Sequence, residues 1–381
     1  TKRAIKEANI DTSKIQGIGI SYQMHGLVIV DEAGKALRNS IIWCDSRAVE
    51  IGNKAFAEIG EQKCMEHLLN SPGNFTASKL KWVKENEPAI YNKISKYMLP
   101  GDYIALKLTG EVTTTKNGLS EGMLWDYKEN KVADWLLDYY GIDQSLTPRI
   151  VENFTNQGIV TEKASAESGL PVGIPIVYRA GDQPNNALSL NVLNPGEVAA
   201  TGGTSGVFYA VSEMSSGKST RVNNFVHVNY ELETPRVGKL LNINGAGIQY
   251  RWLRNNMGNE SYEVMNEKAS NVEVGSEGVV VIPFGNGAER MFNNKTIGTH
   301  FLNLNLNIHN SAHLFRASLE GIAFSFVYGM ECLKDDNATI NLIRAGNDNL
   351  FRSEIFSNTV ATLIGHEIEI YNTTGAVGAA R

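Results

Sequence analysis

Two glycine-containing stretches near the middle of the chain hold the residue types best suited to chemistry. The first is Gly181-Asp182-Gln183, and the second is the run Thr-Gly-Gly-Thr-Ser-Gly at 201–206. A carboxylate such as Asp182, in a turn that ends a strand, can approach a hydroxyl group and accept its proton. A glycine-threonine turn can offer backbone N–H groups and hydroxyls to phosphate oxygens. Together they indicate a base near a phosphate-binding turn.

Each stretch also has an ordinary structural interpretation. Asp182 can hydrogen-bond to its own backbone, as aspartates in turns often do. The glycines at 201–206 can serve a tight hairpin that needs a positive φ. Strand-like runs, Glu197 to Ala200 and Val207 to Val211, flank that turn, so a hairpin is expected in either case. The local sequence leaves both interpretations open.

Two further glycine loops stand directly before predicted helices. They are Gly245-Ala246-Gly247 and Gly346 to Asn349. Because the N-terminus of a helix favours anions, either loop is suited to a phosphate group. Either loop is also a candidate for contact with the adenine of a nucleotide. Each can equally be a plain connection. The motifs Gly-x-x-x-x-Gly-Lys-Ser/Thr and Gly-x-Gly-x-x-Gly are absent from the chain, so any nucleotide site must be of another kind.

Polar and aromatic residues of the first half are candidates for contact with a hydroxylated ligand. His25 lies in the turn Gln23-Met24-His25-Gly26, and no second His, Cys or carboxylate stands at metal-ligand spacing from it. It either makes an ordinary hydrogen bond or contacts a sugar hydroxyl. The run Trp43-Cys44-Asp45-Ser46-Arg47 predicts a core aromatic with Asp45 or Ser46 capping the next helix, or an apolar wall with polar partners for a polyol.

The composition is that of an ordinary globular protein. A length of 381 residues allows two or three domains at about 150 residues each. The net charge of −6 disfavours nucleic acid or an anionic membrane as the main partner. Three cysteines without a Cys-x-x-Cys pair fit free thiols in the cytoplasm. No apolar run reaches the roughly 18 residues of a membrane span, and residues 1–6 indicate an amphipathic helix rather than a signal peptide.

The predicted elements that must position these residues belong to an α/β fold. Each half of the chain has short strands followed by helices, which predicts two α/β domains packed across a cleft. Residues 340–371 predict a βαβ unit with Gly346 to Asn349 as its ligand-facing loop. An apolar stripe predicts a helix from Ser311 to Tyr328 that ends at Gly329. Lys116 to Gly122 is expected to be a loop.

Several motifs occur in a familiar order along nearly the whole chain. They are Gln23-Met24-His25-Gly26, Ile42-Trp43-Cys44-Asp45-Ser46-Arg47, Pro100-Gly101-Asp102-Tyr103, Leu108-Thr109-Gly110-Glu111, Gly181-Asp182-Gln183, Gly203-Thr204-Ser205, Leu319-Glu320-Gly321-Ile322-Ala323 and Arg344-Ala345-Gly346. In this order the chain resembles the FGGY carbohydrate kinases. Its Gln-Met-His-Gly turn is most similar to the members that phosphorylate D-xylulose.

The resemblance implies an α/β fold of two ribonuclease H-like domains, of the hexokinase and actin kind, around a central cleft. Residues 1–190 would form the sugar-binding domain and residues 191–381 the nucleotide-binding domain, with the start of the first and the end of the second missing. It also implies ATP as co-substrate, Mg²⁺ on the phosphates and a sugar as acceptor, and it is compatible with a homodimer.

The resemblance also implies roles for individual residues. Asp182 matches the base that takes the proton from the 5-hydroxyl of D-xylulose. The expected sugar-side residues are Gln23, Met24, His25, Trp43, Asp45, Asp182 and Gln183. The expected nucleotide-side residues are Gly203, Thr204, Ser205, Gly245, Gly247, Gly346, Asn347 and Asn349. No direct protein ligand of the metal is assigned. Another ketose or polyol as acceptor, or a non-catalytic binding role, stays open.

Some features depart from the family pattern. Family members begin with a glycine- and threonine-rich hairpin carrying an Asp that helps to place the metal and phosphates, and nothing before Ile15 is similar to it. Asn347 and Asp348 replace the glycines that usually follow Arg344. The usual Asp-Ser-rich loop appears as Lys116 to Gly122, and the last helix is expected to be cut at Arg381.

Overall fold

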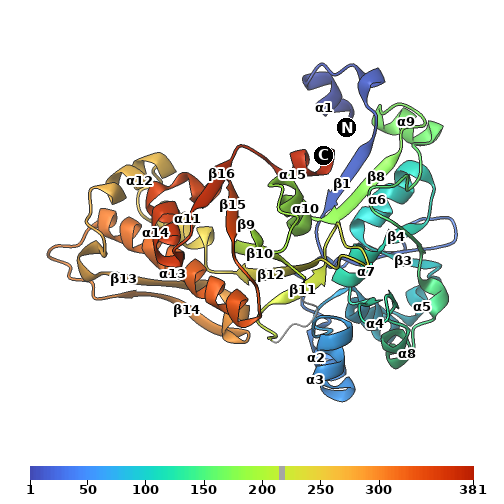
Figure 1. Cartoon of the computed structure of the whole chain (residues 1–381), viewed down its shortest axis with the longest axis horizontal. Coiled ribbons are helices and arrows are strands. Elements are labelled where there is room, and N and C mark those ends of the chain that lie inside the picture. Colours follow the sequence, from blue (N-terminus) through green and yellow to red (C-terminus); the bar gives the residue numbers. More distant parts are fainter. Residues whose placement is uncertain (214–218) are drawn as a thin grey trace.

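The computed structural model describes residues 1–213 and 219–381, and its elements fall into two parts with helix α10 between them (Figure 1). In the N-terminal part, short strands pair two by two. β1 (Ile18–Tyr22) lies parallel to β8 (Ile176–Gly181), and β4 (Thr113–Thr115) lies parallel to β7 (Arg149–Val151). The antiparallel pairs are β2 (Val28–Val30) with β3 (Lys96–Met98) and β5 (Trp125–Asp126) with β6 (Lys131–Val132).

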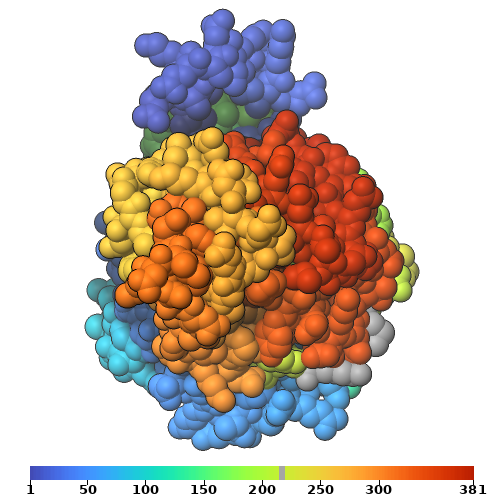
Figure 2. Space-filling view, turned by 90° about the vertical axis from the view of Figure 1, so that its left-hand side faces the viewer, coloured from blue at the N-terminus to red at the C-terminus, as the bar shows by residue number. Residues whose placement is uncertain are grey.

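The helices of this part are α1 (Lys2–Glu7), α2 (Val49–Ile59), α3 (Glu61–His67), α4 (Thr76–Asn86), α5 (Pro88–Tyr91), α6 (Pro100–Thr109), α7 (Lys116–Glu121), α8 (Asp134–Tyr140) and α9 (Glu162–Ser168). Helix α1 has no buried residue, and the N-terminal segment projects beyond the C-terminal part in Figure 2.

The C-terminal part is built on one six-stranded sheet with the order β11-β12-β10-β9-β15-β16. The strands are β9 (Glu197–Gly202), β10 (Gly206–Ser212), β11 (Asn223–Val226), β12 (Val237–Ile243), β15 (Leu342–Gly346) and β16 (Ile368–Tyr371); β13 (Val280–Glu289) and β14 (Lys295–Leu302) form a separate hairpin. The helices of this part are α11 (Gly247–Asn256), α12 (Tyr262–Ser270), α13 (Ser311–Asp335), α14 (Glu354–Ile364) and α15 (Gly375–Ala380), and α10 (Asp182–Ser189) lies between the two parts.

Two predicted connections are confirmed. β9 and β10 are antiparallel neighbours joined at 203–205, so the glycine-threonine run is the turn of a hairpin. β15, α14 and β16 form a βαβ unit whose strands are parallel. The turn glycines do not have the positive φ that a tight hairpin was expected to need. Gly202 and Gly206 instead allow close packing, because an added Cβ would lie 2.9 Å from Leu350 and 2.4 Å from Phe326.

Helix α13 is the centre of the larger core in the C-terminal part. Its predicted apolar stripe is fully buried and consists of Phe315, Leu319, Ile322 and Phe326. The expected stop at Gly329 is wrong, because the helix continues to Asp335. At Gly329 an added Cβ would lie 2.4 Å from Leu241, so this glycine serves close contact with β12 rather than helix termination.

Two other local predictions are wrong. Residues 116–121 form helix α7 rather than a loop, and the Thr115 hydroxyl caps it by accepting a hydrogen bond from the N–H of Gly118 at 3.2 Å. Neither Asp45 nor Ser46 caps the next helix, since α2 begins at Val49 without a side-chain cap.

Strand β11 ties the two parts of the molecule together. The Asn70 side chain donates to the carbonyl of Asn224 at 2.9 Å, and the N–H of Val226 donates to the Ser120 hydroxyl at 2.9 Å. Phe225 of β11 belongs to the same apolar cluster as residues of the N-terminal part. No helix in the described residues is long and apolar enough to cross a bilayer.

Candidate active site

Asp182 stands at the point where β8 meets α10. The strand ends at Gly181, which is paired with Tyr22 of β1, and the helix begins at Asp182. A Cβ at Gly181 would lie 2.4 Å from Cγ of Met24 and 2.5 Å from a carboxylate oxygen of Glu121. Glycine is therefore required there, and the carboxyl group of Asp182 is held beside the Met24 turn.

Burial raises the pKa of the Asp182 carboxyl group above its ordinary value, and hydrogen bonds partly oppose that shift. The Gln183 amide donates to Oδ2 at 3.3 Å. Asp182 thus combines a local hydrogen bond to the Gln183 side chain with a carboxyl group whose pKa is raised by burial.

His25 presents a neutral ring in the neighbouring turn. Its backbone has a φ of 62°, in the left-handed region. Nδ1 lies 2.8 Å from the carbonyl oxygen of Glu121, so Nδ1 carries the proton and donates. Burial lowers the pKa of His25 to about 3. With Nδ1 protonated, Nε2 keeps a lone pair that can accept a hydrogen bond from a hydroxyl group.

Trp43 and Asp45 lie on a loop that is bonded to this turn. The N–H of Trp43 donates to Oε1 of Gln23 at 2.9 Å. Trp43 is 57% exposed, so the alternative of a core aromatic is wrong. Asp45 pairs with Arg47 at 2.6 Å, and that contact holds the pKa of Asp45 at about 2. Asp45 is thus charged and already occupied by Arg47.

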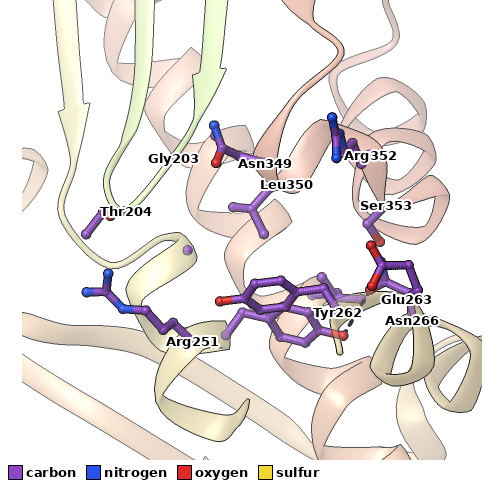
Figure 3. A pocket seen from close by; sticks show the side chains of 14 residues that line it. Gly203, Thr204, Arg251, Tyr262, Glu263, Asn266, Asn349, Leu350, Arg352 and Ser353 are labelled. Carbon is purple, nitrogen blue, oxygen red and sulfur yellow. Dashed lines mark hydrogen bonds between the residues drawn. The ribbon is translucent and has the colours of Figure 1, made fainter. Parts of the chain in front are cut away.

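A cavity of ≈ 440 Å³ lies in the C-terminal part, on the side of the β9–β10 turn (Figure 3). It is lined by Gly202, Gly203, Thr204, Gly247, Tyr250, Arg251, Tyr262, Glu263, Asn266, Leu319, Asn349, Leu350, Arg352 and Ser353. Four predicted nucleotide-side residues are among them: Gly203, Thr204, Gly247 and Asn349. The structure therefore brings together three loops that are far apart in sequence.

The other four predicted nucleotide-side residues do not line this cavity; they are Ser205, Gly245, Gly346 and Asn347. Asn347 turns toward the end of β16, where its side chain donates to Asn372 at 3.0 Å. Gly245 is packed against the backbone of Pro283, since an added Cβ would lie 2.3 Å from that carbonyl oxygen.

Sequence reasoning missed several residues that shape the cavity. The Glu289 carboxylate accepts hydrogen bonds from the N–H groups of Gly245 at 2.6 Å and Asn244 at 3.1 Å, and so fixes the loop before α11. Tyr250 and Tyr262 stack with ring centroids 5.8 Å apart and form an aromatic wall. Arg251 supplies a positive charge to the lining. None of these residues lies in a short motif, so only the fold could identify them.

A metal ion has no protein cage in the described part of the chain. Within residues 1–213 and 219–381, no group of three or more His, Cys, Asp or Glu side chains is placed to hold one. Mg²⁺ commonly keeps several waters and is bound through substrate phosphates rather than by protein ligands alone. No residue is therefore assigned to the metal.

The chain matches two family models end to end. The FGGY family of carbohydrate kinases, N-terminal domain, matches residues 1–189, and the C-terminal domain of the same family matches residues 198–381. The chain therefore belongs to the FGGY family of carbohydrate kinases. The resemblance seen in the sequence is confirmed, and the protein is a carbohydrate kinase with the two-domain α/β fold of hexokinase and actin.

Individual relatives agree with this family. The chain is 27% identical to a xylulose kinase of Escherichia coli, over 100% of this chain and 77% of that protein. A xylulose kinase structure from Rhodospirillum rubrum is 26% identical with a TM-score of 0.86, covering 99% of this chain and 77% of that one. A Plasmodium falciparum glycerol kinase with ADP shares the fold at 22% identity and a TM-score of 0.87, covering 99% and 77%.

A gluconate kinase from Lactobacillus acidophilus shares the fold as well, at 21% identity and a TM-score of 0.84, covering 98% of this chain and 75% of that one. One architecture thus serves proteins with different acceptors. The fold alone does not select a sugar for this chain.

Proposed function

We propose that the protein transfers the γ-phosphoryl group of ATP to the 5-hydroxyl of D-xylulose, with Asp182 as general base. The observation that carries the proposal is the position of Asp182 at the start of α10, directly after Gly181, where an added Cβ would lie 2.4 Å from Cγ of Met24. This packing supports a base that lies against the Gln23-Met24-His25 turn. The similarity to xylulose kinases over the whole chain supports D-xylulose as the acceptor.

The proposed division of labour follows the two parts of the molecule. Residues 1–190 form the sugar-binding domain and residues 191–381 the nucleotide-binding domain. In the first, Gln23, Met24, His25 and Trp43 face the sugar with Asp182 and Gln183, and Nε2 of His25 accepts a hydrogen bond from a sugar hydroxyl. Asp45 contributes to the sugar side indirectly, through its ion pair with Arg47. A cytoplasmic location and a homodimer stay predictions.

In the nucleotide domain, the phosphates lie against the β9–β10 turn and the N-terminus of α11. The turn offers Gly203, Thr204 and Ser205, and Gly247 begins the helix next to it. The N–H of Gly247 donates to the carbonyl of Gly203 at 3.1 Å, so the two loops are hydrogen-bonded to each other. We place the base of the nucleotide toward Asn349 and the Tyr250–Tyr262 wall. Gly245, Gly346 and Asn347 support these loops from outside the cavity.

In the proposed reaction, the 5-hydroxyl gives its proton to a carboxylate oxygen of Asp182 while its oxygen forms a bond to the γ-phosphorus. The bond from that phosphorus to the β,γ-bridging oxygen breaks, and ADP leaves. When bound to the phosphates, Mg²⁺ would neutralise part of their charge. The chain's own residues orient the acceptor, accept its proton and hold the phosphates.

Asp182→Asn tests the role of the base. Asparagine keeps the size of the side chain but cannot accept the proton, so turnover should fall by about 10²–10⁴-fold while D-xylulose still binds. The measurements are ADP release and sugar-binding calorimetry on the full-length protein. Unchanged turnover would refute the assignment of Asp182.

A panel of acceptors tests the substrate. D-xylulose, ribulose, glycerol and gluconate are compared by kcat/KM in the same ADP-release assay. The highest value should belong to D-xylulose. Activity on one of the other acceptors alone would keep the family chemistry and reject the proposed sugar. Binding of a sugar and ATP without any ADP release would favour the non-catalytic alternative.

A further inference from the structure

Lys79 is a fully buried cation whose bonds go to the sugar side of the site. It lies in α4 and has 0% relative exposure. Its ammonium group donates to the carbonyl oxygen of His25 at 2.9 Å and to that of Ile42 at 2.9 Å. These two carbonyls belong to the two segments that present His25 and Trp43. The Lys79 side chain therefore connects the two segments that carry the predicted sugar-side residues.

Lys79 differs from two other fully buried cations in the described residues, because each of those is paired with a carboxylate. The ammonium of Lys239 lies 2.7 Å from the Asp336 carboxylate, and the guanidinium of Arg179 lies 3.2 Å from that of Asp102. Lys79 instead donates to two neutral carbonyls, while the nearby Asp45 carboxylate is paired with Arg47. Burying a charge without a carboxylate is costly, and an apolar side chain would fill the space at lower cost.

The two segments need a connection at this point. They pair with each other through Leu27 and Ile41, whose backbones exchange hydrogen bonds of 2.9 and 3.1 Å. Beyond that bridge, the N–H of Trp43 donates to the Gln23 side chain and links the two segments again on the sugar side. The carbonyl of His25 belongs to a residue in the left-handed region, so its orientation depends on what holds it.

We infer that Lys79 is a positioning residue of the sugar site: its ammonium group sets the spacing between the His25 turn and the Trp43 loop without touching the sugar. The inference rests on the proposed function, because it takes these two segments as the sugar-binding surface. It assigns to Lys79 a role in sugar affinity rather than in proton transfer or nucleotide binding.

Lys79→Met is the main test, because methionine fills a similar volume and donates no hydrogen bond. The dissociation constant of D-xylulose, measured by calorimetry without ATP, should rise by about tenfold or more. KM for the sugar should rise with it, while kcat at saturating sugar changes less. Lys79→Arg, which keeps the charge and the donors, should recover part of the lost affinity.

Two controls separate positioning from a general loss of structure. Lys81→Met changes a lysine of the same helix that pairs on the surface with Glu85, so sugar affinity should not change. The affinity of Lys79→Met for ADP, which reports on the other domain, should also stay at the wild-type value. Its thermal unfolding should remain a single cooperative transition.

The outcomes separate a failure of the proposed function from a failure of the inference. Wild-type protein that binds no sugar would refute the proposed function itself. Wild-type binding with equal sugar affinity in Lys79→Met would refute the inference alone. A parallel loss of sugar and ADP affinity in Lys79→Met would also refute it, because Lys79 would then support the fold and not the sugar site.

Discussion

Lys79→Met should change how the stability of the protein depends on pH. Burial lowers the pKa of Lys79 from 10.5 to about 8 in the folded state. Between these two values the unfolded chain binds the proton more strongly than the folded protein does. By linkage, this group makes the free energy of unfolding rise with pH above about 8, and it costs stability below that pH. Methionine at position 79 does not titrate, so it gives the free energy of unfolding no such dependence on pH.

The magnitude follows from this shift in pKa. From the folded pKa of about 8 to a measurement at about pH 9.5 there are about 1.5 pH units, each worth about 1.4 kcal/mol. The wild type should therefore gain about 2 kcal/mol relative to Lys79→Met between about pH 7 and about pH 9.5. The other groups near this site, including Cys44 and Asp45, are present in both proteins, so their contributions largely cancel.

Urea unfolding of both proteins at the two pH values measures this difference. The quantity compared is the free energy of unfolding of the wild type minus that of the variant. Parallel pH curves would show that Lys79 keeps an ordinary pKa, and the description of its ammonium as buried without a carboxylate partner would be wrong. Lys81→Met, at a partly exposed position on the same helix, should follow the wild-type curve.

Three further predictions concern the base, the nucleotide loops and the buried ion pair. Since burial raises the pKa of Asp182, the midpoint of the fall in kcat/KM with decreasing pH should lie above 3.8, the ordinary pKa of this carboxyl group. A pH–rate profile checks this, and a plateau in kcat/KM that continues down to about pH 4 would contradict it. Gly247→Ala places a Cβ 2.3 Å from the carbonyl of Gly203, so KM for ATP should rise by about tenfold with little change in sugar affinity. Gly17→Ala is the matched control, because its added carbon meets Val177 at 3.4 Å. Equal ATP kinetics in both variants would refute the placement of the phosphates. Arg179→Met leaves Asp102 buried without its partner, so the free energy of unfolding should fall by about 3–5 kcal/mol at neutral pH. Thermal unfolding measures this loss of stability. At acid pH Asp102 can take up a proton, so a loss that stays the same there would count against this cause.

Much of the fold could be predicted from local patterns. The hairpin at 201–206 and the βαβ unit at 340–371 follow from strand runs that turn residues separate, and such signals depend only on neighbours in sequence. The length of α13 could not be predicted in this way. Gly329 looks like a stop by propensity, and only its contact with Leu241 in β12 explains why the helix continues.

The candidate site also combines features that the sequence predicts with features that depend on the tertiary structure. The sequence by itself determined which residue types are available: Asp182 after a glycine, the His25 turn and the loops at Gly203 and Gly247. Only the tertiary structure decided which of them share a cavity, that Asn347 turns away toward Asn372, and that Glu289 fixes the Gly245 loop. Lys79 gave no sequence signal, because a lysine in an amphipathic helix is expected to face water. Its burial depends on the distant segments that pack over α4, and contacts between distant segments leave no local pattern in a single sequence.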